Sequence, residues 1–260
     1  MGEKILIVIC AMILIPGMLL TGCKRVAIDS DTGPTVTRSY NFTDFNIIEI
    51  GYAFKLEVTP ADTYSISISA GESLFDHIEV TKEGNKLKIG MDRLFFHFNR
   101  SPRVKITMPE LRGLHLSGAS EGNVTGFRSS QDFDLTLSGA SELDMDMETG
   151  AFEGELSGWS EVTGYLKAGS CDIELSGASE ITLDGSGGNI RLDASGASQV
   201  DLAYFTVNNA DINLSGASDA SLLINGRLDV SLSGGSFLEY GDNPTLGSFD
   251  VTGGSELKRR

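Results

Sequence analysis

The stretch Leu175-Ser176-Gly177-Ala178-Ser179-Glu180-Ile181-Thr182-Leu183 decides the fold of this chain. Its Ser-Gly-Ala-Ser core recurs in eight imperfect copies, which begin at Ser117, Ser138, Ser157, Ser176, Ser195, Ser215, Ser233 and Thr252. Successive copies start 18 to 21 residues apart, and a short segment of alternating apolar and polar residues follows each one. A period of about 19 residues built from strands and glycine turns is typical of a solenoid.

Helical repeats are excluded because the segments between the copies alternate with period two, as in 172–175 and 211–214. Leucine-rich repeats need longer units and an asparagine ladder, and calcium-binding nonapeptide repeats need Gly-Gly-x-Gly-x-Asp; the sequence has neither. We therefore predict an all-β, parallel β-helix of about 19 residues per coil, with two or three short strands in each coil. Each strand pairs with its equivalent in the next coil, about 4.8 Å away.

One copy of the repeat carries Trp159 where the other copies carry alanine or glycine. Because a stacked interior is close-packed, a tryptophan there would displace the neighbouring coils. The third residue of each copy is therefore predicted to point outward, and the glycine and last serine to lie inward or in a corner. There, small residues allow a sharp bend and the serine hydroxyl can bond free backbone groups. The coil that contains Ala194, where other coils have leucine, is expected to pinch or bulge.

The chain before the repeats divides into three segments. Residues 1–22 are predicted to be a lipoprotein signal peptide. The apolar run 5–20 is too short for a comfortable membrane-spanning helix, and the sequence Leu20-Thr21-Gly22 leads directly to Cys23, the predicted site of lipidation. Residues 23–39 are polar and predict a tether. Residues 40–112 alternate with period two and predict an N-terminal β segment that joins or caps the β-helix of 113–260. We expect 40–260 to form one continuous domain.

Composition limits the classes of function. The formal net charge of -16 argues against nucleic-acid binding. After removal of the signal peptide and lipidation of Cys23, only Cys171 remains, so no intramolecular disulfide is expected and Cys171 is predicted to be a small buried side chain. The three histidines lie in no metal-binding or triad motif, and the repeated serines lack a predicted base. We therefore predict no catalytic residue, no metal site and no cofactor, and leave the oligomeric state open.

An acidic residue follows most copies of the repeat. These residues are Glu121, Glu142, Glu161, Glu180, Asp219 and Glu256, with breaks at Gln199 and Phe237. Stacked coils would place the carboxylates in one column, where neighbours repel by roughly 0.9 kcal/mol before screening. We interpret the column as a solvated face. The alternative is that the carboxylates bind divalent cations. Trp159, Glu121, Glu142, Glu161 and Glu180 are the candidate surface-binding residues.

The segment 104–111 (Val-Lys-Ile-Thr-Met-Pro-Glu-Leu), followed by 114–120 (Leu-His-Leu-Ser-Gly-Ala-Ser), resembles bacterial envelope proteins described as auto-transporter adhesins with a head GIN domain. Matching patterns at 45–50, 58–66 and 84–89 extend this resemblance over about 42–257. It implies a lipoprotein or secreted protein with a right-handed β-helix. It brings no catalytic residues. Trp159, Gly235 and Gly254 depart from the repeat and put the regularity of the coils in question.

The leading functional hypothesis is a non-catalytic cell-envelope lipoprotein that acts as an adhesin or binding module. It would be held on a membrane by its lipid, on the outer membrane if the cell has two, and would bind a glycan or protein at the cell surface. The alternatives are a polysaccharide lyase or hydrolase and a ligand-free structural or stress-response component. Aromatic residues around Trp159 would favour glycan stacking, whereas acids beside Arg or Lys in a groove would favour the enzyme.

Overall fold

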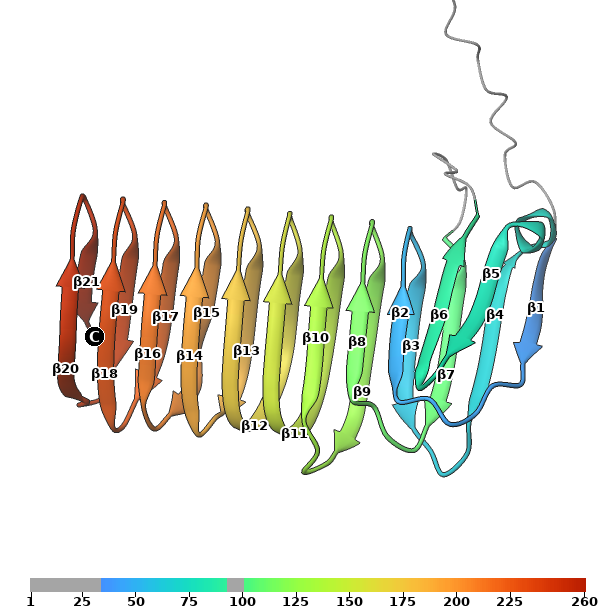
Figure 1. The fold of residues 1–260 in the computed structure, drawn as a ribbon, viewed down its shortest axis with the longest axis horizontal. Helices are drawn as coiled ribbons and strands as arrows, with labels where there is room; N and C mark the ends of the chain where they lie inside the picture. Colours follow the sequence, from blue (N-terminus) through green and yellow to red (C-terminus); the bar gives the residue numbers. More distant parts are fainter. Residues whose placement is uncertain (1–33, 93–100) are drawn as a thin grey trace, which may run out of the picture.

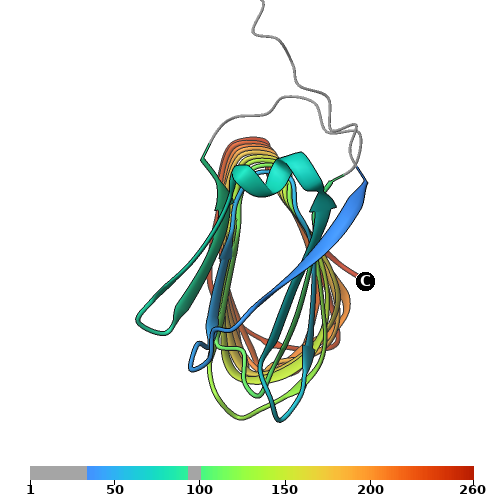
Figure 2. The same cartoon turned by 90° about the vertical axis from the view of Figure 1, so that its right-hand side faces the viewer.

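The computed structural model describes residues 34–92 and 101–260, which form a parallel β-solenoid with two strands in most coils (Figure 1). The predicted fold of about eight turns with about 19 residues per coil is confirmed. Viewed down its axis, the solenoid is a flattened tube with two long walls (Figure 2). The last residue described, Arg260, belongs to the final coil.

The first wall holds β2 (Ile47–Ile50) and the strands that precede the Ser-Gly-Ala-Ser turns: β8 (Gly113–Leu116), β10 (Phe133–Leu137), β14 (Asn189–Ala194), β16 (Ala210–Leu214), β18 (Arg227–Leu232) and β20 (Thr245–Val251). The second wall holds β3 (Lys55–Pro60) and the strands that follow these turns: β9 (Glu121–Arg128), β13 (Glu180–Ser186), β15 (Gln199–Val207), β17 (Asp219–Ile224), β19 (Phe237–Gly241) and β21 (Glu256–Arg259). Strands β11 (Glu142–Leu156) and β12 (Glu161–Leu175) run from the second wall into the first without a break.

The Ser-Gly-Ala-Ser turns have the corner structure that the sequence predicts. Gly177 has a φ of +79°, and a Cβ there would lie 2.6 Å from the carbonyl oxygen of Gly158 in the preceding coil. Only glycine combines this left-handed backbone with so close an approach. Ser179 is buried and donates a hydrogen bond of 2.8 Å from Oγ to the carbonyl oxygen of Ser176. Trp159 is 71% exposed, so the third residue of the turn does point outward.

Inward side chains form the predicted columns. On the first wall, the column Leu116, Leu137, Leu156, Leu175, Ala194, Leu214, Leu232 and Val251 is paired residue for residue, and all members except Val251 are buried. The coil that contains Ala194 does bulge, but in β15 and not beside Ala194, because β14 pairs with both neighbours without a register shift. Strand pairing is set by the backbone, so a smaller inward side chain does not alter it. Register shifts also occur in the pairing of β9 with β11 and of β18 with β20.

The N-terminal segment both extends and caps the solenoid. The coil of β2 and β3 lies between the first repeat coil, β8 and β9, and an outer coil of β6 (Lys86–Met91) and β7 (Arg103–Met108). The antiparallel strands β5 (Ile78–Glu83) and β4 (Ser65–Gly71) then cover the edges of β6 and β7, with the 3-10 helix Glu72–Asp76 after β4. Such a cap protects edges that would otherwise invite aggregation.

Part of the predicted tether is a strand. β1 (Thr35–Tyr40) pairs antiparallel with β4, from Thr35 opposite Gly71 to Tyr40 opposite Ile66. Its residues are mostly polar and exposed, so the sequence lacked an apolar pattern, and the free edge of β4 supplies the hydrogen bonds. The signal peptide, Cys23 and the aromatic run 94–98 lie outside the described residues. Within 34–92 and 101–260, no helix has the length and apolarity needed to cross a membrane.

Candidate functional site

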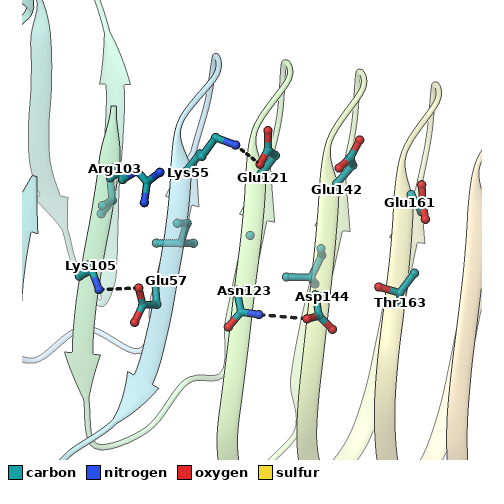
Figure 3. Close-up of a pocket in the computed structure, with 14 residues that line it drawn as sticks. Lys55, Glu57, Arg103, Lys105, Glu121, Asn123, Glu142, Asp144, Glu161 and Thr163 are labelled. Atoms are coloured by element: carbon teal, nitrogen blue, oxygen red, sulfur yellow. Dashed lines mark hydrogen bonds and ion pairs between the residues drawn. The ribbon is translucent and has the colours of Figure 1, made fainter. Parts of the chain in front are cut away.

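A groove of about 420 Å³ runs along the outer surface of the second wall, where the N-terminal coils meet the repeats (Figure 3). It lies between two rows of outward side chains, each contributed by strands β7, β3, β9, β11 and β12 in that order. The upper row is Arg103, Lys55, Glu121, Glu142 and Glu161. The lower row is Lys105, Glu57, Asn123, Asp144 and Thr163. We call this site the junction groove.

Charge reverses along the junction groove. Lys55 pairs with Glu121 at 2.5 Å across the boundary between the N-terminal coils and the repeats. Lys105 pairs with Glu57 at 2.7 Å in the lower row. The guanidinium of Arg103 has no ion pair or hydrogen bond within the described part of the chain. The groove therefore has an uncompensated cation at one end and a run of acids at the other.

The structure brings together the acidic residues singled out from the sequence. Glu121, Glu142, Glu161 and Glu180 pair residue for residue in adjacent strands, and the column continues through Gln199, Asp219, Phe237 and Glu256. Apart from Glu121, the glutamates of this column have no ion-pair partner within 34–92 and 101–260. Glu142 and Glu161 line the junction groove, whereas Glu180 lies one coil beyond it.

Trp159 stands apart from the groove, on the turn between β11 and β12. It lines a hollow of only about 50 Å³ together with Glu142, Glu161 and Glu180. No other aromatic residue of the described ranges lines this hollow. The aromatic cluster that would favour glycan stacking at Trp159 is therefore not formed at this turn.

The basic residues of the groove were not identified from the sequence. Lys55, Arg103 and Lys105 are outward residues of alternating strands, which is visible in the sequence as Lys55-Leu56-Glu57 and Arg103-Val104-Lys105. Their position beside Glu121 depends on the insertion of the β2–β3 coil between β6–β7 and β8–β9. No local sequence pattern predicts this order of coils.

A second groove, of about 530 Å³, follows the first wall over six coils. One side is lined by outward polar residues of the strands, Glu155, Glu174, Asp193 and Asn213. The other side is lined by the first serines of the turns, Ser157, Ser176, Ser195 and Ser215. It contains no lysine or arginine. It therefore differs from the junction groove in having no cation among its lining residues, although Arg191 of the same strand pairs with Asp193 at 2.8 Å.

Burial shifts the pKa values of two reactive side chains, Cys171 and His115. Cys171 is buried in the core, and this burial raises the pKa of its thiol to about 12, as expected for a structural cysteine. Burial also lowers the pKa of His115, with the nearby Lys86 adding to the effect. Among the described residues, no three His, Cys, Asp or Glu side chains are grouped so that they could hold a metal ion.

Sequence comparison gives the family. The family described as "Putative auto-transporter adhesin, head GIN domain" matches residues 44–244, which is more than half of the chain. The chain belongs to this family. The match runs from the β2–β3 coil through β19, so the N-terminal coils and most of the solenoid are part of the family's pattern. No curated protein sequence matches the chain.

Solved structures share this fold at low sequence identity. A "putative adhesin" from Parabacteroides merdae ATCC 43184 is 16% identical, with a TM-score of 0.80 over 89% of this chain and 98% of that one. A "putative lipid binding protein" from Parabacteroides distasonis ATCC 8503 is 17% identical, with a TM-score of 0.79 over 89% and 98%. A "putative adhesin" from Bacteroides fragilis NCTC 9343 is 16% identical, with a TM-score of 0.68 over 89% and 99%. The likeness shows a common solenoid fold.

Proposed function

We propose that the protein is a non-catalytic binding module of the cell envelope and that it binds its partner through the outer surface of the second wall. The observation that carries this proposal is the junction groove, a 420 Å³ hollow in which charged side chains stand in two rows on rigid strands. The paired strands hold successive residues of each row about 4.8 Å apart, so the protein loses little conformational entropy when a ligand binds. The adhesin description of the family is consistent with this role.

The proposal includes a lipid anchor at Cys23, which would hold the solenoid at the membrane surface through the segment that precedes β1. The support is the sequence Leu20-Thr21-Gly22-Cys23 after an apolar run. Expression of Cys23→Ser in the native cell tests it. We expect the wild type in the membrane fraction, labelled by palmitate, and the variant released and unlabelled. Release of both proteins, or labelling of the variant, would exclude lipidation at this cysteine.

Binding is tested with the mature protein, residues 24–260, on arrays of glycans and of extracellular-matrix proteins. We expect a specific ligand for the wild type and at least a tenfold loss of affinity for the double variant Glu142→Lys, Glu161→Lys. Glu174→Lys is the matched control, because Glu161 and Glu174 lie on the same strand β12 but on opposite walls. No ligand on either array, or equal losses from both walls, would contradict the proposed surface.

A carbohydrate-active enzyme is the second candidate, because the junction groove places acids beside Arg103 and Lys55. Glycoside hydrolysis uses a pair of carboxylates, and Glu142, Asp144 and Glu161 line one hollow. Incubation with a panel of polysaccharides would decide the matter. Release of reducing ends by the wild type, lost in Glu142→Gln or Glu161→Gln, would replace the binding proposal with the enzyme.

A further inference from the structure

A third row of side chains on the second wall alternates between carboxylate and tyrosine. Asp146 of β11 pairs with Tyr165 of β12, and Tyr165 pairs with Asp184 of β13. In the next coil, Gly185 pairs with Phe205, which places Tyr204 beside Asp184. We call Asp146, Tyr165, Asp184 and Tyr204 the tyrosine row. It lies two residues along the strands from the lower row of the junction groove, on the same surface.

Tyr204 reaches this row through a β-bulge. Between its pairings with β13, strand β15 carries one more residue than its partner. On the other side, Leu202 pairs with Leu222 and Thr206 with Leu223, so three residues of β15 have no partner in β17. A bulge interrupts the strand pairing and redirects side chains. Here it turns the ring of Tyr204 to solvent, 78% exposed, while the neighbouring Phe205 is buried.

Side chains around the bulge hold it in place. Oδ1 of Asp201 accepts a hydrogen bond of 3.0 Å from the backbone N–H of Ala203 and one of 2.9 Å from the hydroxyl of Ser221. The insertion also explains why the turns at Ser195 and Ser215 are 20 residues apart, whereas each of the three preceding intervals is 19 residues. The bulge is thus a built feature that places one aromatic ring on the surface.

The geometry points to a glycan. Tyr165, 41% exposed, and Tyr204 are two coils apart, a separation of about 9.6 Å along the axis at 4.8 Å per coil. A single exposed aromatic residue is ordinary on a protein surface. Two aromatic rings in one row with a carboxylate between them are complementary to a sugar, which has both an apolar ring face and polar hydroxyl groups. The apolar face of a pyranose ring packs on tyrosine, and its hydroxyls donate to carboxylates. Asp184 has no ion-pair partner in the described ranges, so its oxygens are available, whereas Asp146 pairs with Arg128 at 2.7 Å.

We propose that the tyrosine row binds a neutral, linear oligosaccharide that lies along the solenoid axis, with sugars i and i+2 stacked on Tyr165 and Tyr204. This rests on the proposed binding function and names its ligand class. An extended β-1,4-linked chain advances by about one strand spacing per sugar, so three consecutive sugars span the two rings. A polyanion is disfavoured because Asp184 is an acid without an ion pair among the described residues and the chain has a net charge of -16. An apolar peptide would bury Asp184 without hydrogen bonds.

Calorimetric titration of residues 24–260 with cellohexaose, xylohexaose and chitohexaose tests the proposal, with oligogalacturonate as the acidic comparison. We expect one neutral hexasaccharide to bind, its disaccharide to bind at least tenfold more weakly, and oligogalacturonate not to bind. Tyr165→Ala and Tyr204→Ala should each weaken binding about tenfold, and Tyr204→Phe should retain it. Phe249→Ala, which removes an exposed aromatic of β20 on the first wall, is the matched control and should bind as the wild type does.

Circular dichroism melts verify that each variant is folded. Binding of a neutral hexasaccharide that survives the double change Tyr165→Ala, Tyr204→Ala would overturn the tyrosine row while leaving the proposed function standing. So would the absence of hexasaccharide binding by a protein that still captures an array ligand through Glu142 and Glu161. Absence of any ligand, on the arrays and in the titrations alike, would overturn both proposals.

Discussion

The glycine column of the turns offers the sharpest test of how this solenoid is held together. Replacing Gly177 by alanine places a β-carbon on a residue with a φ of +79°. An L-residue in this left-handed conformation costs about 1–2 kcal/mol. The new Cβ would also lie 2.6 Å from the carbonyl oxygen of Gly158, whereas ordinary contacts begin at 3.4 Å, so the coils must separate there by about 0.8 Å.

That separation stretches the hydrogen bond of 2.8 Å from the N–H of Ala178 to the carbonyl oxygen of Gly158, which contributes about 1 kcal/mol. The expected loss in free energy of unfolding is therefore about 2–3 kcal/mol, or about 4–12 °C in Tm for a chain of this size. Guanidinium unfolding followed by far-UV circular dichroism measures it, as a lower midpoint at unchanged slope.

Ala178→Ser is the matched control, because it also adds one heavy atom to the same turn, at the exposed position. It should change stability by less than about 0.5 kcal/mol. If Gly177→Ala unfolds within 0.5 kcal/mol of the wild type, or if both variants lose the same amount, the explanation of the glycine column by backbone conformation and coil contact is refuted.

Three further predictions concern the serine, cysteine and glutamate columns. Ser179→Ala removes the buried hydrogen bond to the carbonyl oxygen of Ser176 and should cost about 1–2 kcal/mol in the same unfolding assay, so a neutral result would exclude a structural role for the hydroxyl. Because burial raises the pKa of the Cys171 thiol from 9.0 to about 12, the unfolded chain releases this proton first, and stability should fall between pH 9 and pH 12 more steeply in the wild type than in Cys171→Ala. Equal slopes for the two proteins would contradict it. The double change Glu142→Gln, Glu161→Gln should raise stability by about 1 kcal/mol at low salt, because neighbouring charges repel by up to about 0.9 kcal/mol per pair, and this gain should vanish in 1 M NaCl. A loss of stability in the double variant would instead indicate that the carboxylates hold a cation.

The sequence by itself determined the repeating part of this protein. Alternation with period two fixed which residues of each strand point inward, because successive side chains of a strand face opposite sides. The repeated glycine and serine fixed the turn, since the left-handed φ and the short serine hydrogen bond are local properties of four residues. Trp159 was assigned to the surface by size alone, and the acidic column followed from the period.

Only the tertiary structure decided how the unrepeated parts pair. The order β6–β7, β2–β3, β8–β9 places Lys55 beside Glu121 and leaves Arg103 without a partner in the described ranges, and no local pattern encodes it. Strand β1 forms because β4 offers a free edge, although its own residues are polar. The bulge that presents Tyr204 depends on which residues of β15 align with β13 and β17. Side-chain periodicity is a local property of the backbone, whereas strand neighbours and groove walls are set by contacts between residues far apart in the chain.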